Sequence, residues 1–135
     1  MFKVGFYNAL KYQSIASPTY CYYFEFFTKE SKSIINTSER KLGVAHGDDI
    51  FLIFNNRNLS DYEKDEIQLG RDFVEMYKDF AQTNEFKFNN LSMQPISNDN
   101  LKCLRIKSPS NFATMHVDGN SFANSEFWKS LRIIE

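Results

Sequence analysis

The segment from Ser17 to Phe27 constrains the fold more than any other part of the chain. It reads Ser-Pro-Thr-Tyr-Cys-Tyr-Tyr-Phe-Glu-Phe-Phe, so aromatic residues follow one another with almost no polar alternation. Aromatic side chains favour strands, and a strand without alternation is typical of a sheet that is covered on both faces. Pro18 marks where the extended segment starts. The sequence therefore predicts a strand over residues 19–27 that is buried on both faces inside an α/β protein.

A histidine lies in a glycine-flanked loop further along the chain. Residues 43–54 read Gly-Val-Ala-His-Gly-Asp-Asp-Ile-Phe-Leu-Ile-Phe, which places His46 on a flexible backbone in front of two aspartates and an apolar run. An imidazole titrates near neutral pH, so it can take and return a proton. Residues 28–40 predict a surface loop from the strand to His46, and catalytic residues of α/β sheets collect beyond the carboxyl ends of strands. His46 is therefore a candidate general base.

The longest predicted helix covers Asp61 to Thr83. Ser60 and Glu63 have the spacing of a capping box, in which two side chains satisfy backbone amides at the start of a helix. Apolar residues then recur at helical spacing, at Ile67, Gly70, Phe73, Val74, Tyr77, Phe80 and Ala81. Because such a stripe is usually packed in a core, we expect these side chains to be buried.

The remaining elements are shorter. A helix is predicted over 2–10, with Phe2, Phe6, Ala9 and Leu10 on one face. Residues 84–100 read as irregular. Two strands follow, Leu101 to Lys107 and Phe112 to Val117, joined through Ser108-Pro109-Ser110, and a helix over 122–134 closes the chain with Phe127, Leu131 and Ile134 on one face. His116, in the second strand, is interpreted as a structural residue because no partner residues cluster near it in the sequence.

Together, the aromatic strand, the His46 loop and the elements after it resemble the C-terminal part of the type-B carboxylesterases. This cholinesterase-like α/β-hydrolase family includes the insect juvenile hormone esterases. The resemblance implies that residues 1–135 form one part of an α/β-hydrolase fold without a second domain, comprising a core strand, the histidine loop, a long helix, two short strands and a closing helix. It also implies that His46 is the base of a Ser–Glu/Asp–His triad, with Asp48 and Asp49 as structural neighbours and no cofactor or metal.

Two segments depart from the family pattern. The usual Gly-Asn-Pro after the long helix is replaced by Asn84-Glu85-Phe86, and a Trp is absent before Pro95. More importantly, serine hydrolases of this fold carry the nucleophile on a Gly-x-Ser-x-Gly turn that precedes the acid and the histidine in the chain. No such motif occurs here, and no carboxylate before His46 fits the acid. We therefore expect the 135 residues alone to be inactive, although they supply the base.

Two other interpretations are open. The family contains adhesion proteins of the neuroligin type that keep the fold without the nucleophile, so the chain could come from a non-catalytic interaction protein or be a fold remnant. His46, Asp48 and Asp49 could instead be metal ligands in an unrelated small α+β protein, but adjacent side chains seldom converge on one ion without distant ligands.

Composition limits the classes of partner. The net charge is −1, and the charges of both signs are interspersed, so nothing indicates nucleic acid or an anionic membrane surface. Apolar runs are too short to span a membrane. The expected ligand is a small carboxylic ester, bound only by a full-length protein. In some relatives the last helices form a dimer interface, so a homodimer through the C-terminal helices is also compatible with the resemblance.

The cellular compartment of the protein is suggested by glycosylation sequons rather than by a signal peptide. The N-terminus lacks the pattern of a signal peptide, but Asn-x-Ser/Thr sequons occur at Asn36, Asn58 and Asn90, and together with the family resemblance they favour a secreted glycoprotein. The two cysteines, Cys21 and Cys103, lie in predicted strands, where we expect buried free thiols rather than a disulfide.

Overall fold

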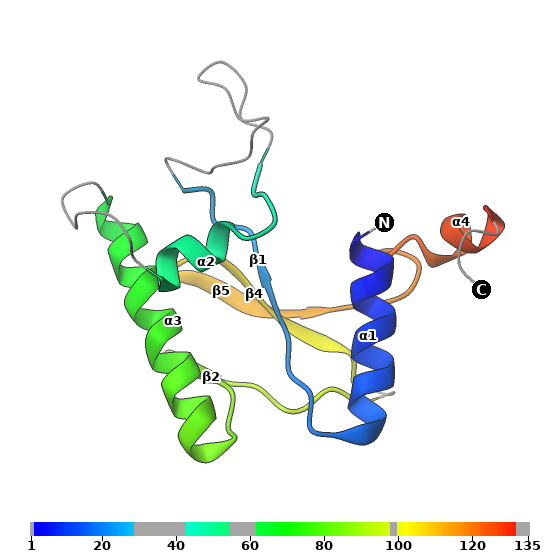
Figure 1. Cartoon of the computed structure of the whole chain (residues 1–135), viewed down its shortest axis with the longest axis horizontal. Helices are drawn as coiled ribbons and strands as arrows, with labels where there is room; N and C mark the ends of the chain where they lie inside the picture. Colours follow the sequence, from blue (N-terminus) through cyan, green and yellow to red (C-terminus); the bar gives the residue numbers. More distant parts are fainter. Residues whose placement is uncertain (1, 29–42, 55–61, 98–99, 132–135) are drawn as a thin grey trace. The chain divides into compact units, whose positions relative to one another are not determined.

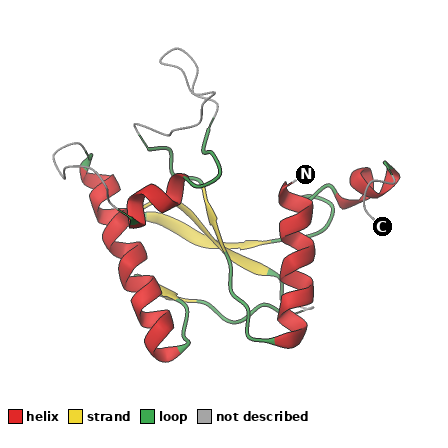
Figure 2. Cartoon of the chain, in the orientation of Figure 1, coloured by secondary structure: helices red, strands yellow, loops and turns green. Residues whose placement is uncertain are grey.

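The computed structural model describes residues 2–28, 43–54, 62–97 and 100–131. Its elements are drawn in Figures 1 and 2. In chain order they are α1 (Phe2–Ala16), β1 (Tyr22–Phe24), α2 (Asp48–Ile53), α3 (Lys64–Thr83), β2 (Lys87–Phe88), β3 (Leu91–Ser92), β4 (Lys102–Ser108), β5 (Asn111–His116) and α4 (Ser125–Ser130). The predicted α/β class is confirmed.

The chain forms two compact units. The first comprises residues 1–22, 94–104 and 114–135, and the second comprises 23–93 and 105–113. Each strand of the main sheet passes from one unit to the other. The predicted surface loop over 28–40 falls almost entirely outside the described residues, as do Ser60, Asp61, Asn36 and Asn58.

The main sheet has the strand order β1-β4-β5. The Leu104 N–H donates to the Cys21 carbonyl (2.9 Å) and the Glu25 N–H donates to the Ile106 carbonyl (2.8 Å), so β1 and β4 run parallel. A two-residue connection joins β4 to β5, as only antiparallel neighbours allow. The two predicted strands near the C-terminus are thus confirmed to within a residue or two.

The aromatic strand is shorter than predicted. The sequence favours a strand over 19–27 buried on both faces, whereas β1 covers three residues, and all three are only partly buried. In the described part of the chain β1 is an edge strand, since only β4 pairs with it. Aromatic residues favour an extended backbone, but a strand extends only as far as a neighbour pairs with it.

In the first unit, α1 packs on the segment that follows β5. The helix is longer than the predicted 2–10, and it buries Val4 and Leu10. Ala9, expected on the buried face, is exposed. The ring centroids of Phe6 and Phe122 are 6.1 Å apart, and the Lys3 ammonium lies over the Phe122 ring, 5.1 Å from its centroid.

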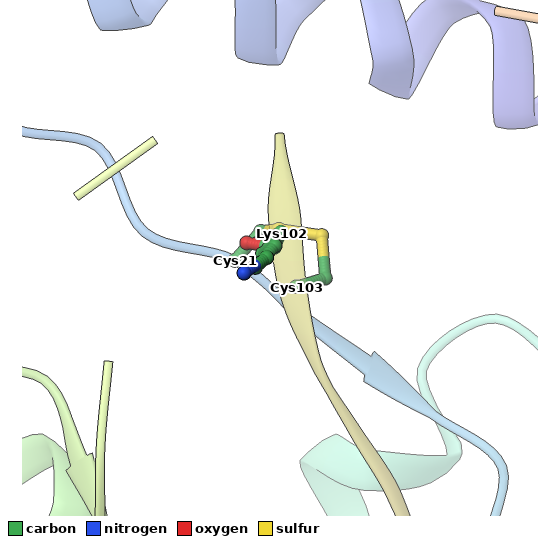
Figure 3. The surroundings of a disulfide bond; sticks show 3 residues. All are labelled: Cys21, Lys102 and Cys103. Atoms are coloured by element: carbon green, nitrogen blue, oxygen red, sulfur yellow. Dashed lines mark hydrogen bonds between the residues drawn. A yellow bond between two sulfur atoms is a disulfide. The ribbon is translucent and has the colours of Figure 1, made fainter. Parts of the chain in front are cut away.

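The expectation of free thiols is wrong, because Cys21 and Cys103 form a disulfide within the first unit (Figure 3). Their Cα atoms are 4.9 Å apart, within the range that a disulfide spans. Cys21 directly precedes β1 and Cys103 lies on the adjacent β4, so parallel pairing of these segments brings together residues 82 positions apart. A separation of this length gives no sequence signal for pairing.

The second unit is held by a chain of aromatic side chains. Phe73 of α3 lies 5.8 Å from Phe24 of β1 and 5.9 Å from Phe88 of β2, and Phe88 in turn lies 5.1 Å from Phe112 of β5, all measured between ring centroids. Leu69, next to Phe73 on α3, is fully buried as well. These contacts fix α3 against strand residues of the same unit.

The long helix is confirmed, but its start and its buried face differ from the prediction. It begins at Lys64, and its capping box is formed by Glu63 and Glu66, where the Glu63 N–H donates to Glu66 Oε2 (2.9 Å). The buried face carries Glu66, Leu69, Asp72, Phe73 and Met76. Of the predicted stripe only Phe73 belongs to it, while Val74, Tyr77 and Phe80 are 50%, 42% and 37% exposed.

Two short elements complete the description. Residues 84–100, expected to be irregular, contain the β2–β3 hairpin, with Lys87 opposite Ser92 and Phe88 opposite Leu91. Within the predicted closing helix over 122–134, the described residues contain α4, and Phe127 and Leu131 are exposed, while Ile134 lies outside the described residues. In the described residues no helix is both long and apolar enough to cross a membrane.

Candidate active-site loop

His46 is exposed in the turn directly before α2. Gly43 and Gly47 on either side have φ angles of 105° and 88°. Residues with a Cβ rarely adopt these values, so the backbone conformation explains why glycine occurs at both positions. The loop therefore places His46 at the surface of the second unit.

Asp48 holds this loop. Its side chain is 3% exposed, and its Oδ2 accepts a hydrogen bond from the Ala45 N–H (2.8 Å), while its own N–H donates to the Ala45 carbonyl (3.3 Å). The two bonds bridge the residues on both sides of His46. A carboxylate that receives a backbone N–H makes a charge-assisted bond, which is stronger than a neutral one. The buried Asp48 carboxylate thus stabilises the conformation of the histidine loop.

The second aspartate differs from the first. Asp49 is partly exposed and lies with Asp48 in the first turn of α2. Negative charges are favourable at that end of a helix because its backbone N–H groups have no partners within the helix. Both carboxylates thus lie at the start of α2, two and three residues after His46.

The helix that follows the loop is anchored on α3. Leu52 is buried, and a Cβ added to Gly70 of α3 would lie 2.7 Å from the Leu52 carbonyl oxygen. The Tyr62 hydroxyl also reaches the Phe51 carbonyl (3.4 Å). Because α2 follows Gly47 without a break, these contacts position His46 as well. Only a residue without a side chain at position 70 allows the two backbones to approach this closely.

A depression of about 360 Å³ lies between the same two helices. Its lining includes Leu52, Ile53, Tyr62, Ile67, Arg71 and Val74. His46 is not among the lining residues, so this depression is a feature of the helix pair rather than of the histidine loop.

The metal alternative names His46, Asp48 and Asp49 as ligands. Among the residues that the structure describes, no three His, Cys, Asp or Glu side chains are grouped so as to hold an ion. The Asp48 carboxylate points back to the loop backbone, where it accepts the Ala45 N–H. His116, the other histidine, is exposed at the end of β5.

Sequence comparison relates nearly the whole chain to a known family. The model of the carboxylesterase family matches residues 1–127. A carboxylic ester hydrolase of Bombus ignitus is 27% identical over 137 residues, and venom carboxylesterase-6 of Apis mellifera is 28% identical over 136 residues. Each match covers 97% of this chain and 24% of the relative, so the chain spans about a quarter of the length of these proteins.

The mixed helices and strands, with an exposed histidine on a loop, are those of part of an α/β-hydrolase domain. The chain belongs to the carboxylesterase family, because the family model matches nearly all of it. The predicted membership is therefore confirmed.

Proposed function

We propose that the chain is the C-terminal segment of a carboxylic ester hydrolase and that His46 is the general base of its serine triad. The observation that carries the proposal is the position of His46. It is exposed between two glycines with positive φ angles, on a loop whose backbone donates a hydrogen bond to the buried Asp48. The names of the two insect relatives support the class of reaction, hydrolysis of carboxylic esters.

In this mechanism His46 takes the proton of a serine hydroxyl as that oxygen attacks the ester carbonyl. It then gives the proton to the departing alcohol, and the same exchange with water releases the acid. A base in this role must keep one orientation while its proton comes and goes. The Asp48 carboxylate contributes to that by holding the backbone beside His46, and the α2–α3 contact fixes the end of the loop.

The serine, the acid and the oxyanion hole are assigned to the rest of the protein. The 135 residues contain no Gly-x-Ser-x-Gly motif, and the chain spans only about a quarter of the length of its relatives. We expect the transcript to continue in frame upstream of the Met1 codon and to encode that motif. An upstream sequence with the serine replaced would favour a non-catalytic relative instead.

Exposed apolar side chains on α2 and α3 also support assignment to a larger domain. Ile50 and Phe54 are 50% and 70% exposed in or beside α2, and Val74 and Tyr77 form an exposed row on α3. Apolar surface of this kind is normally covered in a folded protein. We assign its cover to the remainder of the hydrolase domain, with residues 1–135 belonging to one domain.

The decisive experiment compares the two histidines in the full-length protein. His46→Ala should lower kcat for a p-nitrophenyl ester by roughly 10⁴-fold or more, as expected for loss of a triad member. His116→Ala is the matched control, because this histidine is also exposed but belongs to β5 rather than to the glycine-flanked loop. It should leave kcat unchanged.

Two results would contradict the proposal. One is esterase activity of the full-length protein that survives His46→Ala. The other is turnover by the isolated 135-residue chain that disappears in the same variant, since the chain is expected to lack the nucleophile.

A further inference from the structure

One sequon lies in a well-defined part of the fold. Asn90, Leu91 and Ser92 occupy the turn and the second strand of the β2–β3 hairpin. Asn90 and Ser92 are both exposed, whereas Leu91 between them is partly buried. Ser92 pairs with the exposed Lys87 across the hairpin. The two side chains that define the sequon are therefore available at the surface.

The two adjacent asparagines of the turn have different roles. Asn89 has a φ of 52°, and its side-chain amide donates to Asp72 Oδ2 of α3 (3.3 Å). Within the described residues the Asn90 carboxamide makes no hydrogen bond. Asn89 thus holds the turn against the helix, and this leaves Asn90 at its tip with a free amide nitrogen. Because Asn90 is exposed, a substituent on its side chain breaks none of the described hydrogen bonds.

An independent observation indicates the compartment. The Cys21–Cys103 disulfide is of a kind that forms and persists in oxidising environments such as the secretory pathway. Glycans are attached to asparagine in that same pathway. The sequon is thus found in a chain whose covalent structure fits the place where the modification occurs.

We propose that Asn90 carries an N-linked glycan. In the reaction the Asn90 side-chain nitrogen forms a bond to the anomeric carbon of an oligosaccharide carried on a lipid diphosphate. The bond between that carbon and the diphosphate oxygen breaks, the lipid diphosphate leaves with the electron pair, and the amide nitrogen loses one proton. The Ser92 hydroxyl completes the recognition sequence. The inference does not depend on the proposed esterase reaction.

The test uses the full-length protein secreted from a eukaryotic host. Peptide-N-glycosidase converts a glycosylated asparagine to aspartate, and digestion in ¹⁸O water labels that aspartate. Trypsin then releases residues 88–102 as one peptide, which contains a single sequon. We expect the label at position 90, with positions 89, 98 and 100 unlabelled. Recovery of this peptide with unmodified Asn90 in the secreted protein would overturn the proposal.

Matched variants distinguish the loss of the sequon from an effect on the fold. Asn90→Gln and Ser92→Ala should each remove one glycan, seen as one mobility step on a gel, while Ser92→Thr should retain it. Asn89→Gln leaves the sequon intact and should also retain it. If a variant is not secreted, peptide-N-glycosidase digestion of the protein from the cell's membrane fraction shows whether the variant carries the glycan. Loss of the mobility step in Ser92→Thr, or its retention in Ser92→Ala, would contradict the assignment.

Discussion

Replacement of Gly70 by alanine tests whether α2 is seated on α3 as described. In an ordinary helix interior, Gly→Ala stabilises a protein by about 0.5–1 kcal/mol, because glycine loses more backbone entropy on folding. At position 70 the new Cβ would lie 2.7 Å from the backbone oxygen of Leu52, whereas ordinary contacts begin near 3.4 Å. The atom in the way belongs to the backbone, so α2 must move by the difference, 3.4 − 2.7 = 0.7 Å.

The expected cost follows from that displacement. Overpacking in a well-packed region costs about 1–3 kcal/mol, which exceeds the gain in helix propensity. We therefore expect Gly70→Ala to lower the free energy of unfolding by about 1–2 kcal/mol, or the Tm by roughly 4 °C per kcal/mol. Since α2 begins two residues after His46, the proposed function predicts that the same shift also lowers the esterase rate of the full-length protein.

Gly5→Ala is the matched control for the same substitution. Gly5 also lies inside a helix, α1, but apart from its chain neighbours and the nearby backbone of α1 no atom lies within 4 Å of the Cβ that alanine would add. This variant should raise the Tm, while Gly70→Ala lowers it in the same protein under the same heating rate. If both variants raise the Tm, then α2 and α3 do not approach each other as closely as the structure shows.

Three further variants test other contacts. Cys103→Ser should lower the free energy of unfolding by about 2–5 kcal/mol in denaturant titrations, since the disulfide closes a long loop; a change below about 1 kcal/mol would contradict the pairing. The side-chain and backbone hydrogen bonds from Ser121 lower the pKa of Asp118 below its usual 3.8, so this group stabilises the fold above that pH and loses its effect as the pH falls through the lowered value. Asp118→Asn should therefore destabilise the protein at pH ~6 more than at pH ~2, measured by thermal melts, and an equal effect at both would refute this. Asp48→Ala should lower the free energy of unfolding by about 1.5–3 kcal/mol and accelerate hydrogen exchange at the Ala45 amide. Asp48→Asn keeps an acceptor and should have a smaller effect on both quantities. Equal exchange rates in the two variants would show that Asp48 does not hold the loop.

Local sequence signals predicted several elements well. The β4–β5 hairpin follows from two β-favouring runs separated by a proline-containing turn, and α3 follows from a long helical period. The C-terminal limit of α3 at Thr83 agrees with the prediction, while its start lies three residues later than predicted, at Lys64, where Glu63 and Glu66 form a capping box. The predicted pair, Ser60 and Glu63, has the same spacing, so the sequence alone could not decide between the two pairs.

The buried face of α3 could not be read from periodicity. Two neighbouring faces of this helix carry apolar residues, one with Leu69 and Met76 and the other with Val74 and Tyr77. Periodicity identifies a helix, but the choice of buried face depends on what packs against it, here α2 and β2. The β2–β3 hairpin was missed for a related reason, because its strands have two residues each and too few positions to show an alternation.

For the candidate site, too, some features follow from the sequence and others only from the tertiary structure. The sequence by itself determined the family, the glycine-flanked position of His46 and the absence of a Gly-x-Ser-x-Gly motif from these 135 residues, because these depend on residue types at fixed spacing. Only the tertiary structure decided that Asp48 is buried and holds the loop, that Gly70 admits the Leu52 carbonyl, and that Cys21 meets Cys103. Most of these contacts join residues far apart in the chain, and such distances are set by the packing of whole elements rather than by any local pattern.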